Sequence, residues 1–309
     1  MSRPRWILSF LLTPFLRERS IPLVRPTRLD RNPSLLPQTI QIDGGHTIFY
    51  TVNGVGRPLV LIHGYGAGIW VWEKQIEVLS QGYRVYALDL IGHGFSDRPK
   101  IPYTPETYID CLRDFMDGVG VEKATLIGNS MGGGVAWAMA IIFPERVDRL
   151  ILIDCVPPDV LHEVKNESFR MLAAIMDIPF LPYLVMAVRN RDSIRKVLLE
   201  CISDIQRVTP EVVNQQYHLS RIKGTTWALY STFKHAREAL KHRDRFPLIR
   251  KPTLFVWGER DLVFPPQLGE TLHQAITGSK LRVIKKSGHI PMWETPEEVN
   301  GAILDFLSE

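Results

Sequence analysis

Short apolar runs recur along most of this 309-residue chain, and stretches of helical pattern separate them. Several runs are continuously apolar, as the strands of a parallel sheet must be when both of their faces are buried. Alternation of strand and helix predicts a doubly wound, mostly parallel α/β sheet, and 45% hydrophobic residues are enough for a large core. The seven runs cover residues 47–52, 59–63, 84–88, 124–127, 150–154, 253–257 and 281–285.

The alternation breaks between residues 155 and 250, where we find helical patterns and no convincing strand. A stretch of roughly 95 residues is too long for an ordinary loop, so we expect a helical insertion that forms a cap. The helical patterns cover residues 168–176, 194–205 and 227–240. The predicted domains are a core of residues 38–154 and 251–309, the cap of residues 155–250, and an N-terminal arm and linker of residues 1–37.

The positive charge of the chain is concentrated in the arm. Residues 1–31 contain seven arginines against Glu18 and Asp30, a net charge of +5, whereas the whole chain has a net charge of +4. The remaining residues therefore carry −1. Because a nucleic-acid-binding domain needs a basic surface on its folded body, this distribution argues against a nucleic-acid partner.

The arm also contains an apolar run from Trp6 to Leu16, flanked by arginines. As a helix, 11 residues span roughly 16 Å, too short for about 30 Å of hydrocarbon, and no signal-peptide cleavage site follows the run. The pattern predicts a weak anchor that lies on an anionic membrane surface, with a loose tail or a segment packed on the body as the alternatives.

Three cysteines, Cys111, Cys155 and Cys201, form no CxxC pair. A disulfide framework and a zinc site are therefore not expected, and a reducing compartment fits this cysteine usage. Together with the arm, this predicts a cytoplasmic protein with peripheral membrane contact through residues 1–31.

The pentapeptide Gly128-Asn129-Ser130-Met131-Gly132 stands between an apolar run and a helical pattern. In a G-x-S-x-G turn from strand to helix, the serine lies on a sharp elbow that exposes its hydroxyl, and the small flanking residues let neighbouring backbone approach. Ser130 is therefore the candidate nucleophile. The alternative is a glycine-rich turn that serves only helix–sheet packing.

A serine hydroxyl needs a base, usually a histidine oriented by a carboxylate. His289 and Asp261 each follow an apolar run, so both are expected at the same edge of the sheet as Ser130. Asp154, also at the end of a run, is the reserve acid. The structural alternatives are a loop histidine that binds backbone and a helix-capping aspartate.

Acyl transfer also needs hydrogen-bond donors for the oxyanion. The N–H of Met131, at the start of the helix after the elbow, is one candidate. The N–H of Tyr65, in the turn His63-Gly64-Tyr65-Gly66, is the second. His63 itself is interpreted as structural, holding the loop through backbone hydrogen bonds.

The sequence resembles the α/β-hydrolase superfamily, in particular its capped esterases and carbon–carbon-bond hydrolases, over residues 40–307. The resemblance implies a helical cap inserted after the sixth strand, and a triad in the chain order Ser130, Asp261, His289. No metal or organic cofactor is implied. The segments that carry the resemblance are residues 63–66, 89–97, 128–133, 257–261, 288–291 and 294–296.

Departures from the pattern of near relatives narrow the chemistry. Haloalkane dehalogenases and epoxide hydrolases carry aspartate at the position of Ser130, and a serine forms an acyl-enzyme instead. The elbow is similar to that of meta-cleavage-product hydrolases, but the loop of residues 64–68 and Ile290 after the histidine differ from theirs. We therefore predict a serine hydrolase of carboxylic esters that acts on substrates with an apolar or lipid-like acyl group. The alternatives are a carbon–carbon-bond hydrolase, action on amides or halides, and a non-catalytic binding protein.

Substrate selection is expected in the cap, whose large apolar residues suit an acyl chain or an aromatic group, although most of them are expected to pack the cap. These residues are Phe169, Met171, Met176, Phe180, Tyr183, Met186, Trp227 and Phe233. The basic residues Arg189, Arg191, Arg195 and Lys196 are interpreted as a solvated helix face rather than a carboxylate clamp. Oligomeric state does not follow from the sequence.

Overall fold

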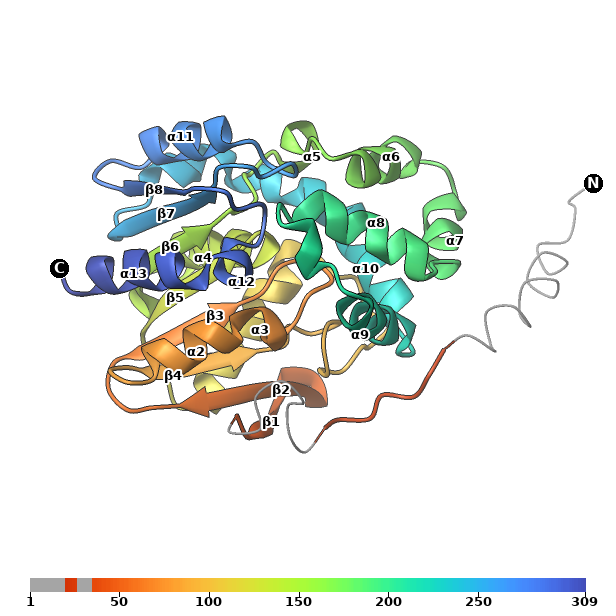
Figure 1. Cartoon of the computed structure of the whole chain (residues 1–309). Helices are drawn as coiled ribbons and strands as arrows, with labels where there is room; N and C mark the ends of the chain where they lie inside the picture. The colour runs from red at the N-terminus through yellow and green to blue at the C-terminus, as the bar shows by residue number, and fades with distance from the viewer. Residues whose placement is uncertain (1–19, 27–34) are drawn as a thin grey trace, which may run out of the picture.

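The computed structural model describes residues 20–26 and 35–309, and one eight-stranded sheet runs through its centre (Figure 1). The strand order is β1-β2-β4-β3-β5-β6-β7-β8; the pairs β1–β2 and β2–β4 are antiparallel and all other pairs are parallel. This confirms the predicted α/β sheet. The strands are β1 (Pro37–Ile42), β2 (His46–Asn53), β3 (Pro58–Ile62), β4 (Arg84–Leu88), β5 (Ala124–Asn129), β6 (Val147–Ile153), β7 (Thr253–Gly258) and β8 (Lys280–Ile284).

Each of the seven predicted runs forms a strand, and β1 is the strand that the sequence pattern did not reveal. Its sequence, Pro-Gln-Thr-Ile-Gln-Ile, is half polar, and it pairs only with β2 at the edge of the sheet. An edge strand buries little apolar surface, so it leaves a weak hydrophobic signal. With β1 counted, β6 is the sixth strand, and the helical insertion follows it.

Two apolar clusters, one on each face of the sheet, form the core. On one face the strands pack against α3 (Pro105–Gly118), α4 (Met131–Ile142) and α11 (Pro266–Ala275). On the other face they pack against α2 (Glu73–Leu79) and α13 (Pro296–Leu307). Neighbouring residues of a strand alternate between the clusters, as period-2 geometry requires: Leu126 belongs to the first and Ile127 to the second. Short elements connect these parts: η1 (Asp43–Gly45), η2 (Ile69–Trp72), η3 (Pro144–Arg146) and α12 (Pro291–Glu294).

The regular elements of the insertion between β6 and β7 are all helices, and α6 to α9 gather at one end of the sheet (Figure 1). We call this insertion the cap. Its elements are α5 (Val160–Glu163), α6 (Glu167–Ile175), α7 (Leu181–Ala187), α8 (Arg191–Cys201), η4 (Ile205–Arg207), α9 (Pro210–Arg221), α10 (Thr225–His235) and η5 (Ala236–Leu248).

The described part of the N-terminal arm and linker is attached to the body. Ile21 forms a parallel bridge with Ile222 at the end of α9, and its backbone exchanges hydrogen bonds with Arg221 and Lys223. Arg25 forms an ion pair with Asp97 in the core. The predicted anchor, from Trp6 to Leu16, lies outside the described residues. None of the helices that the structure describes has the length and apolar character needed to cross a membrane.

Candidate active site

Ser130 lies at a sharp turn between β5 and α4. Its backbone has φ 51° and ψ −119°, a strained combination for a residue with a side chain. Close packing holds the turn: a Cβ added at Gly132 would lie 2.1 Å from the carbonyl oxygen of Ile62 in β3. At Gly128 an added Cβ would lie 2.3 Å from the carbonyl oxygen of Gly132. The glycines of the pentapeptide therefore let β5, α4 and β3 approach one another, as a strand–elbow–helix turn requires.

Ser130, His289 and Asp261 form a continuous hydrogen-bonded chain. The Oγ of Ser130 lies 2.9 Å from Nε2 of His289, and Nδ1 of His289 lies 2.8 Å from Oδ2 of Asp261. Because a carboxylate accepts, Nδ1 carries the proton and Nε2 is left as the acceptor for the serine hydroxyl. All three side chains are buried. The geometry is that of a nucleophile, a base and a group that orients the base.

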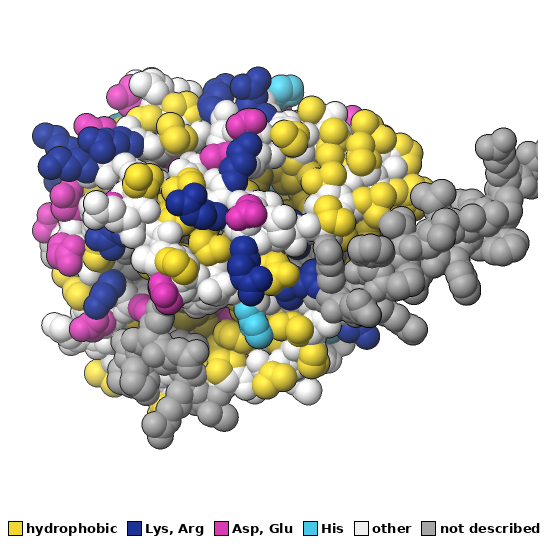
Figure 2. Space-filling model, turned by 45° about the vertical axis from the view of Figure 1, so that its right-hand side comes forward, with side chains coloured by type: hydrophobic (Ala, Val, Ile, Leu, Met, Phe, Trp, Pro, Cys, Tyr) yellow, Lys and Arg dark blue, Asp and Glu magenta, His cyan; other side chains and the backbone are white. Residues whose placement is uncertain are grey.

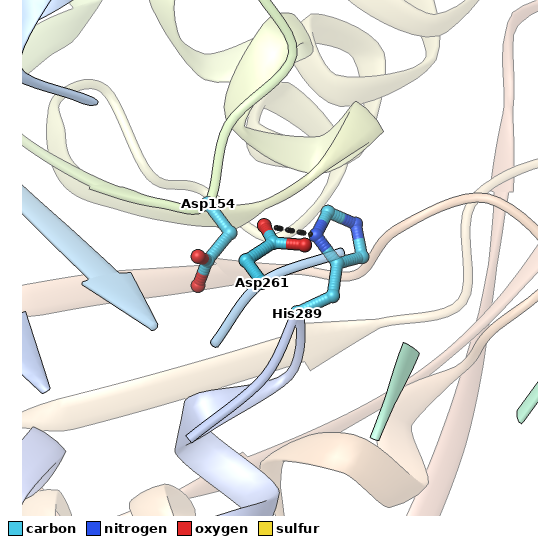
Figure 3. Close-up of side chains that lie close together, drawn as sticks. All are labelled: Asp154, Asp261 and His289. Atoms are coloured by element: carbon cyan, nitrogen blue, oxygen red, sulfur yellow. Dashed lines mark hydrogen bonds and ion pairs between the residues drawn. The ribbon is translucent and has the colours of Figure 1, made fainter. Parts of the chain in front are cut away.

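Asp154, the reserve acid, lies beyond Asp261 rather than against the imidazole (Figure 3). Its Oδ1 accepts from the N–H of Gly258, and its Oδ2 is buried with no hydrogen-bond partner among the described residues. Burial, and then the nearby Asp261 carboxylate, raise the pKa of Asp154 well above its ordinary value. Asp154 therefore holds its proton to higher pH than an exposed aspartate does.

Asp154, Asp261 and His289 are the group of the described chain whose ligand atoms could together hold a metal ion, since these atoms lie within 4.8 Å of one another. Their hydrogen bonds explain the cluster in another way. Oδ1 of Asp261 accepts from the N–H groups of Val263 and Phe264, and its Oδ2 accepts from His289. These partners fix Asp261 in the orientation that a triad acid needs.

Two polar residues that sequence reasoning did not assign hold the histidine loop. The side-chain amide of Asn129 donates to the carbonyl oxygens of His289 and Ile153. The buried carboxylate of Glu294 accepts from the N–H of Gly288 and from the N–H groups of Ser203 and Asp204 in the cap. Both residues stood in the segments that resemble the family, but nothing in the sequence indicated which backbone groups they would bind.

The two predicted oxyanion donors lie beside the elbow. Within residues 20–26 and 35–309, the N–H groups of Tyr65 and Met131 make no hydrogen bond to a protein acceptor. A Cβ added at Gly64 would lie 3.0 Å from Cβ of Ser130, so the loop before Tyr65 runs directly against the serine. Tyr65 is also fixed to the cap, because its hydroxyl donates to the carbonyl oxygen of Leu229.

His63 binds backbone on both sides, as interpreted from the sequence. Its Nε2 accepts from the N–H of Leu90, so Nδ1 carries the proton and donates to the carbonyl oxygen of Gly64 at 2.7 Å. Burial lowers the pKa of His63 to about 4. Asp89 holds the neighbouring turns by accepting from the N–H groups of Ile69 and Phe95, and burial raises its pKa to about 6.

Two cavities meet at Ser130. The narrow cavity has a volume of about 130 Å³, and no Asp, Glu, Lys or Arg occurs among the described residues that line it. The wide cavity has a volume of about 510 Å³ and extends under α6 to α9 of the cap. Ser130, Tyr65 and Phe169 line both cavities. A substrate bound across the serine therefore meets an apolar wall on one side and a mixed wall on the other.

The cap residues divide between these walls, the cap interior and the surface. Phe233 lines the narrow cavity, whereas Met171 and Met186 line the wide one. Phe180 lies 69% exposed at the start of α7. Met176 is buried in a small apolar cluster of the cap, and Trp227 and Tyr183 both pack against Tyr230 in α10.

The predicted solvated basic face is correct for Arg191 and Arg195, which are exposed on α8. For Arg189 it is wrong. Arg189 stands in the short link between α7 and α8, lines the wide cavity, and has a buried Nε. Its neighbours in sequence gave no signal of this, because the direction of the side chain depends on how α7 and α8 pack.

Comparison with known proteins identifies related chains. The model of the α/β hydrolase fold family matches residues 57–296. A 2-hydroxy-6-oxo-2,4-heptadienoate hydrolase from Pseudomonas putida is 33% identical over 82% of this chain and 90% of its own length. A solved meta-cleavage product hydrolase is 28% identical with a TM-score of 0.77, over 90% of this chain and 99% of its own. A solved membrane phospholipase A is 28% identical with a TM-score of 0.70, over 98% of this chain and 92% of its own.

Proposed function

The chain belongs to the α/β-hydrolase family and is a hydrolase, and from this premise we propose that it cleaves carboxylic esters with an apolar acyl group through an acyl-enzyme on Ser130. The observation that carries the proposal is the hydrogen-bonded chain from Ser130 through His289 to Asp261, at the junction of two cavities. The apolar wall of the narrow cavity suits the acyl part of the substrate.

In the proposed reaction, Oγ of Ser130 attacks the ester carbonyl carbon while Nε2 of His289 accepts the hydroxyl proton. The N–H groups of Tyr65 and Met131 donate to the oxyanion of the tetrahedral intermediate. The intermediate collapses, the alcohol leaves with the proton from His289, and the acyl group stays on Ser130. Water then attacks the acyl-enzyme, His289 accepts its proton and returns one to Ser130, and the carboxylic acid is released.

A substrate panel with the Ser130→Ala variant tests the proposal. We expect the wild-type protein to hydrolyse p-nitrophenyl esters, and Ser130→Ala to lose this turnover by about 10⁴-fold or more. Retention of most of the activity in Ser130→Ala would disprove the proposed mechanism. A fluorophosphonate probe separates a serine hydrolase from a non-catalytic binding protein. The hydrolase is expected to be labelled at Ser130, and a pure binding protein would leave Ser130 unlabelled.

Carbon–carbon cleavage is the competing proposal, because a solved relative at 28% identity is a meta-cleavage product hydrolase by name and a relative at 33% identity is a 2-hydroxy-6-oxo-2,4-heptadienoate hydrolase. The same triad serves both reactions, so the panel includes one ring-fission diketone beside the esters. Ester hydrolysis is preferred because Ile290 after the histidine and the oxyanion loop Gly64-Tyr65-Gly66-Ala67-Gly68 both differ from the pattern of meta-cleavage-product hydrolases. Faster cleavage of the diketone than of every ester would reverse this preference.

We also propose that the protein works at a lipid surface. Two observations support this besides the basic and apolar arm: the solved membrane phospholipase A matches 98% of the chain, and apolar side chains are exposed on the cap. Figure 2 shows hydrophobic side chains gathered on the cap side of the molecule. The exposed residues on α6, α7 and the adjoining turns are Met171, Ile178, Phe180, Leu181, Val185 and Val188.

Liposome sedimentation tests the lipid proposal. The full chain is expected to bind vesicles that contain anionic lipid, and removal of residues 1–19 is expected to weaken that binding while turnover of short soluble esters is unchanged. Residues 20–26 stay in the truncated protein because Ile21 and Arg25 contact the body. Equal vesicle binding with and without residues 1–19, or none by the full chain, would refute the role of the arm.

A further inference from the structure

Arg189 is a half-buried cation that lines the wide cavity and has no partner among the described residues. Its Nε is buried and makes no hydrogen bond, and its guanidinium forms no ion pair within the part of the chain that the structure describes. The side chain lies at the junction of α7 and α8, in the same cavity wall as Tyr65 and Ser130. Arg189 therefore faces the space in which a substrate would lie.

The other basic side chains of this cavity are already engaged. Arg98 donates to the carbonyl oxygens of Ser96 and Gly94 and to Oγ1 of Thr225. Lys196 pairs with Glu167 at the surface. No Asp or Glu occurs among the described residues that line the wide cavity. The described residues that line the wide cavity thus supply positive charge and no negative charge.

A buried charge without a counter-ion is unfavourable, because it loses hydration and gains no partner. Burial lowers the pKa of Arg189, and the positive charge of Arg221 adds to this effect. A guanidinium presents a planar pair of N–H donors that matches a carboxylate or a phosphate group. An anionic group of a bound ligand would supply the partner that the protein lacks.

We infer that Arg189 binds an anionic group, a phosphate or a carboxylate, on the alcohol part of the ester substrate. The inference rests on the proposed ester hydrolysis. The uncharged wall of the narrow cavity takes the acyl part, so the opposite end of the substrate, across Ser130, reaches the cavity of Arg189. Arg189 is a binding residue and takes no part in bond cleavage.

Three esters that share the octanoyl group and differ in their alcohol part test this subsite: octanoyl glycerol, octanoyl glycerol 3-phosphate and the octanoyl ester of glycerate. The first is neutral, the second carries a phosphate and the third a carboxylate. Release of octanoate is measured for the full-length protein with each ester. A preference for only one of the two anionic esters identifies the group that Arg189 takes.

The Arg189→Gln variant is expected to lower kcat/KM for the preferred anionic ester by about 10- to 100-fold, mainly through KM. Its kcat/KM for octanoyl glycerol is expected to change by less than about twofold. Arg189→Lys keeps the charge without the planar pair of donors, so an intermediate loss is expected. Arg195→Gln, on the exposed face of α8, is the matched control and is expected to leave the ratio of anionic to neutral turnover unchanged.

Equal losses on the neutral and anionic esters in Arg189→Gln would overturn the inference, as would no loss on either. If the wild-type protein cleaves none of the three esters, the proposed function fails and binding is measured instead. In the full-length Ser130→Ala protein, calorimetry compares octanoyl glycerol 3-phosphate and octanoyl glycerate with octanoyl glycerol. Tighter binding of an anionic ester that Arg189→Gln removes supports the subsite, and equal binding of all three refutes it.

Discussion

Two buried aspartates lie side by side behind the histidine, and they have different tasks. Asp261 binds Nδ1 of His289 and is held by two backbone N–H groups. Asp154 accepts one backbone N–H, and its raised pKa follows from burial and from the Asp261 carboxylate. A proton on Asp154, which its raised pKa favours, would remove the repulsion between two adjacent carboxylates.

Replacing each aspartate by asparagine, one at a time, separates their tasks. Asp261→Asn is expected to lower kcat by about 10⁴-fold, because an amide favours the wrong imidazole tautomer. Asp154→Asn resembles the protonated acid in shape and charge, so a loss below about tenfold is expected. Ester turnover of the purified variants measures both effects, and a reversed order of the two losses would give Asp154 the catalytic role.

How much of the site the sequence predicts differs from residue to residue. Ser130, Asp261 and His289 could be proposed because each follows an apolar run, and the parallel strands bring the ends of such runs to one edge of the sheet. The position of Arg189 in the wall of the wide cavity and the backbone contacts of Asn129 could not. They depend on the packing of loops and helices far apart in the sequence.

At the scale of elements, the elbow depends on the near contact of β5, α4 and β3. The glycines of the pentapeptide carry this contact, since a side chain at Gly132 would collide with the backbone of Ile62. The strands β2 to β8 follow the predicted runs closely because these runs are strongly apolar. The edge strand β1 and the separate helices of the cap have weaker patterns, so their bounds required the structure.

Substitution of Gly132 by alanine is therefore expected to destabilise the protein by about 1–3 kcal/mol, the range for overpacking, and to reduce ester turnover by displacing Met131. The control is Gly301→Ala in α13, where an added Cβ meets nothing within 4 Å. There the better helix propensity of alanine is expected to add up to about 1 kcal/mol. Urea unfolding measures both; equal effects at the two sites would contradict the packing account.

For the whole molecule, buried titratable groups connect stability to pH. The pKa of His63 is about 4 in the folded protein and 6.5 in the unfolded chain, so the unfolded chain binds the proton first as the pH falls. The stability that His63 contributes is present above pH 6.5 and is lost as the pH falls toward 4. Asp89 has a raised pKa of about 6, so its contribution changes in the opposite direction over a similar range.

Comparing the wild-type protein with His63→Gln isolates the contribution of His63 to the pH dependence of stability, because both proteins contain Asp89. Between pH 7 and pH 4, the free energy of unfolding of the wild-type protein is expected to fall by about 3 kcal/mol more than that of His63→Gln. His218→Gln, at an exposed position of α9, serves as the control and should follow the wild-type curve. Parallel curves for wild type and His63→Gln would contradict the account.

The central claim, that Ser130 forms the covalent intermediate, is tested most directly by a slow substrate. A p-nitrophenyl dialkylcarbamate transfers its carbamoyl group to a reactive serine, and the product hydrolyses slowly enough for peptide mass spectrometry of the full-length protein. We predict release of about one p-nitrophenol per chain and a carbamoyl group on the peptide that contains Ser130. A protein that turns over p-nitrophenyl octanoate but carries the carbamoyl group elsewhere, or nowhere, would contradict the account.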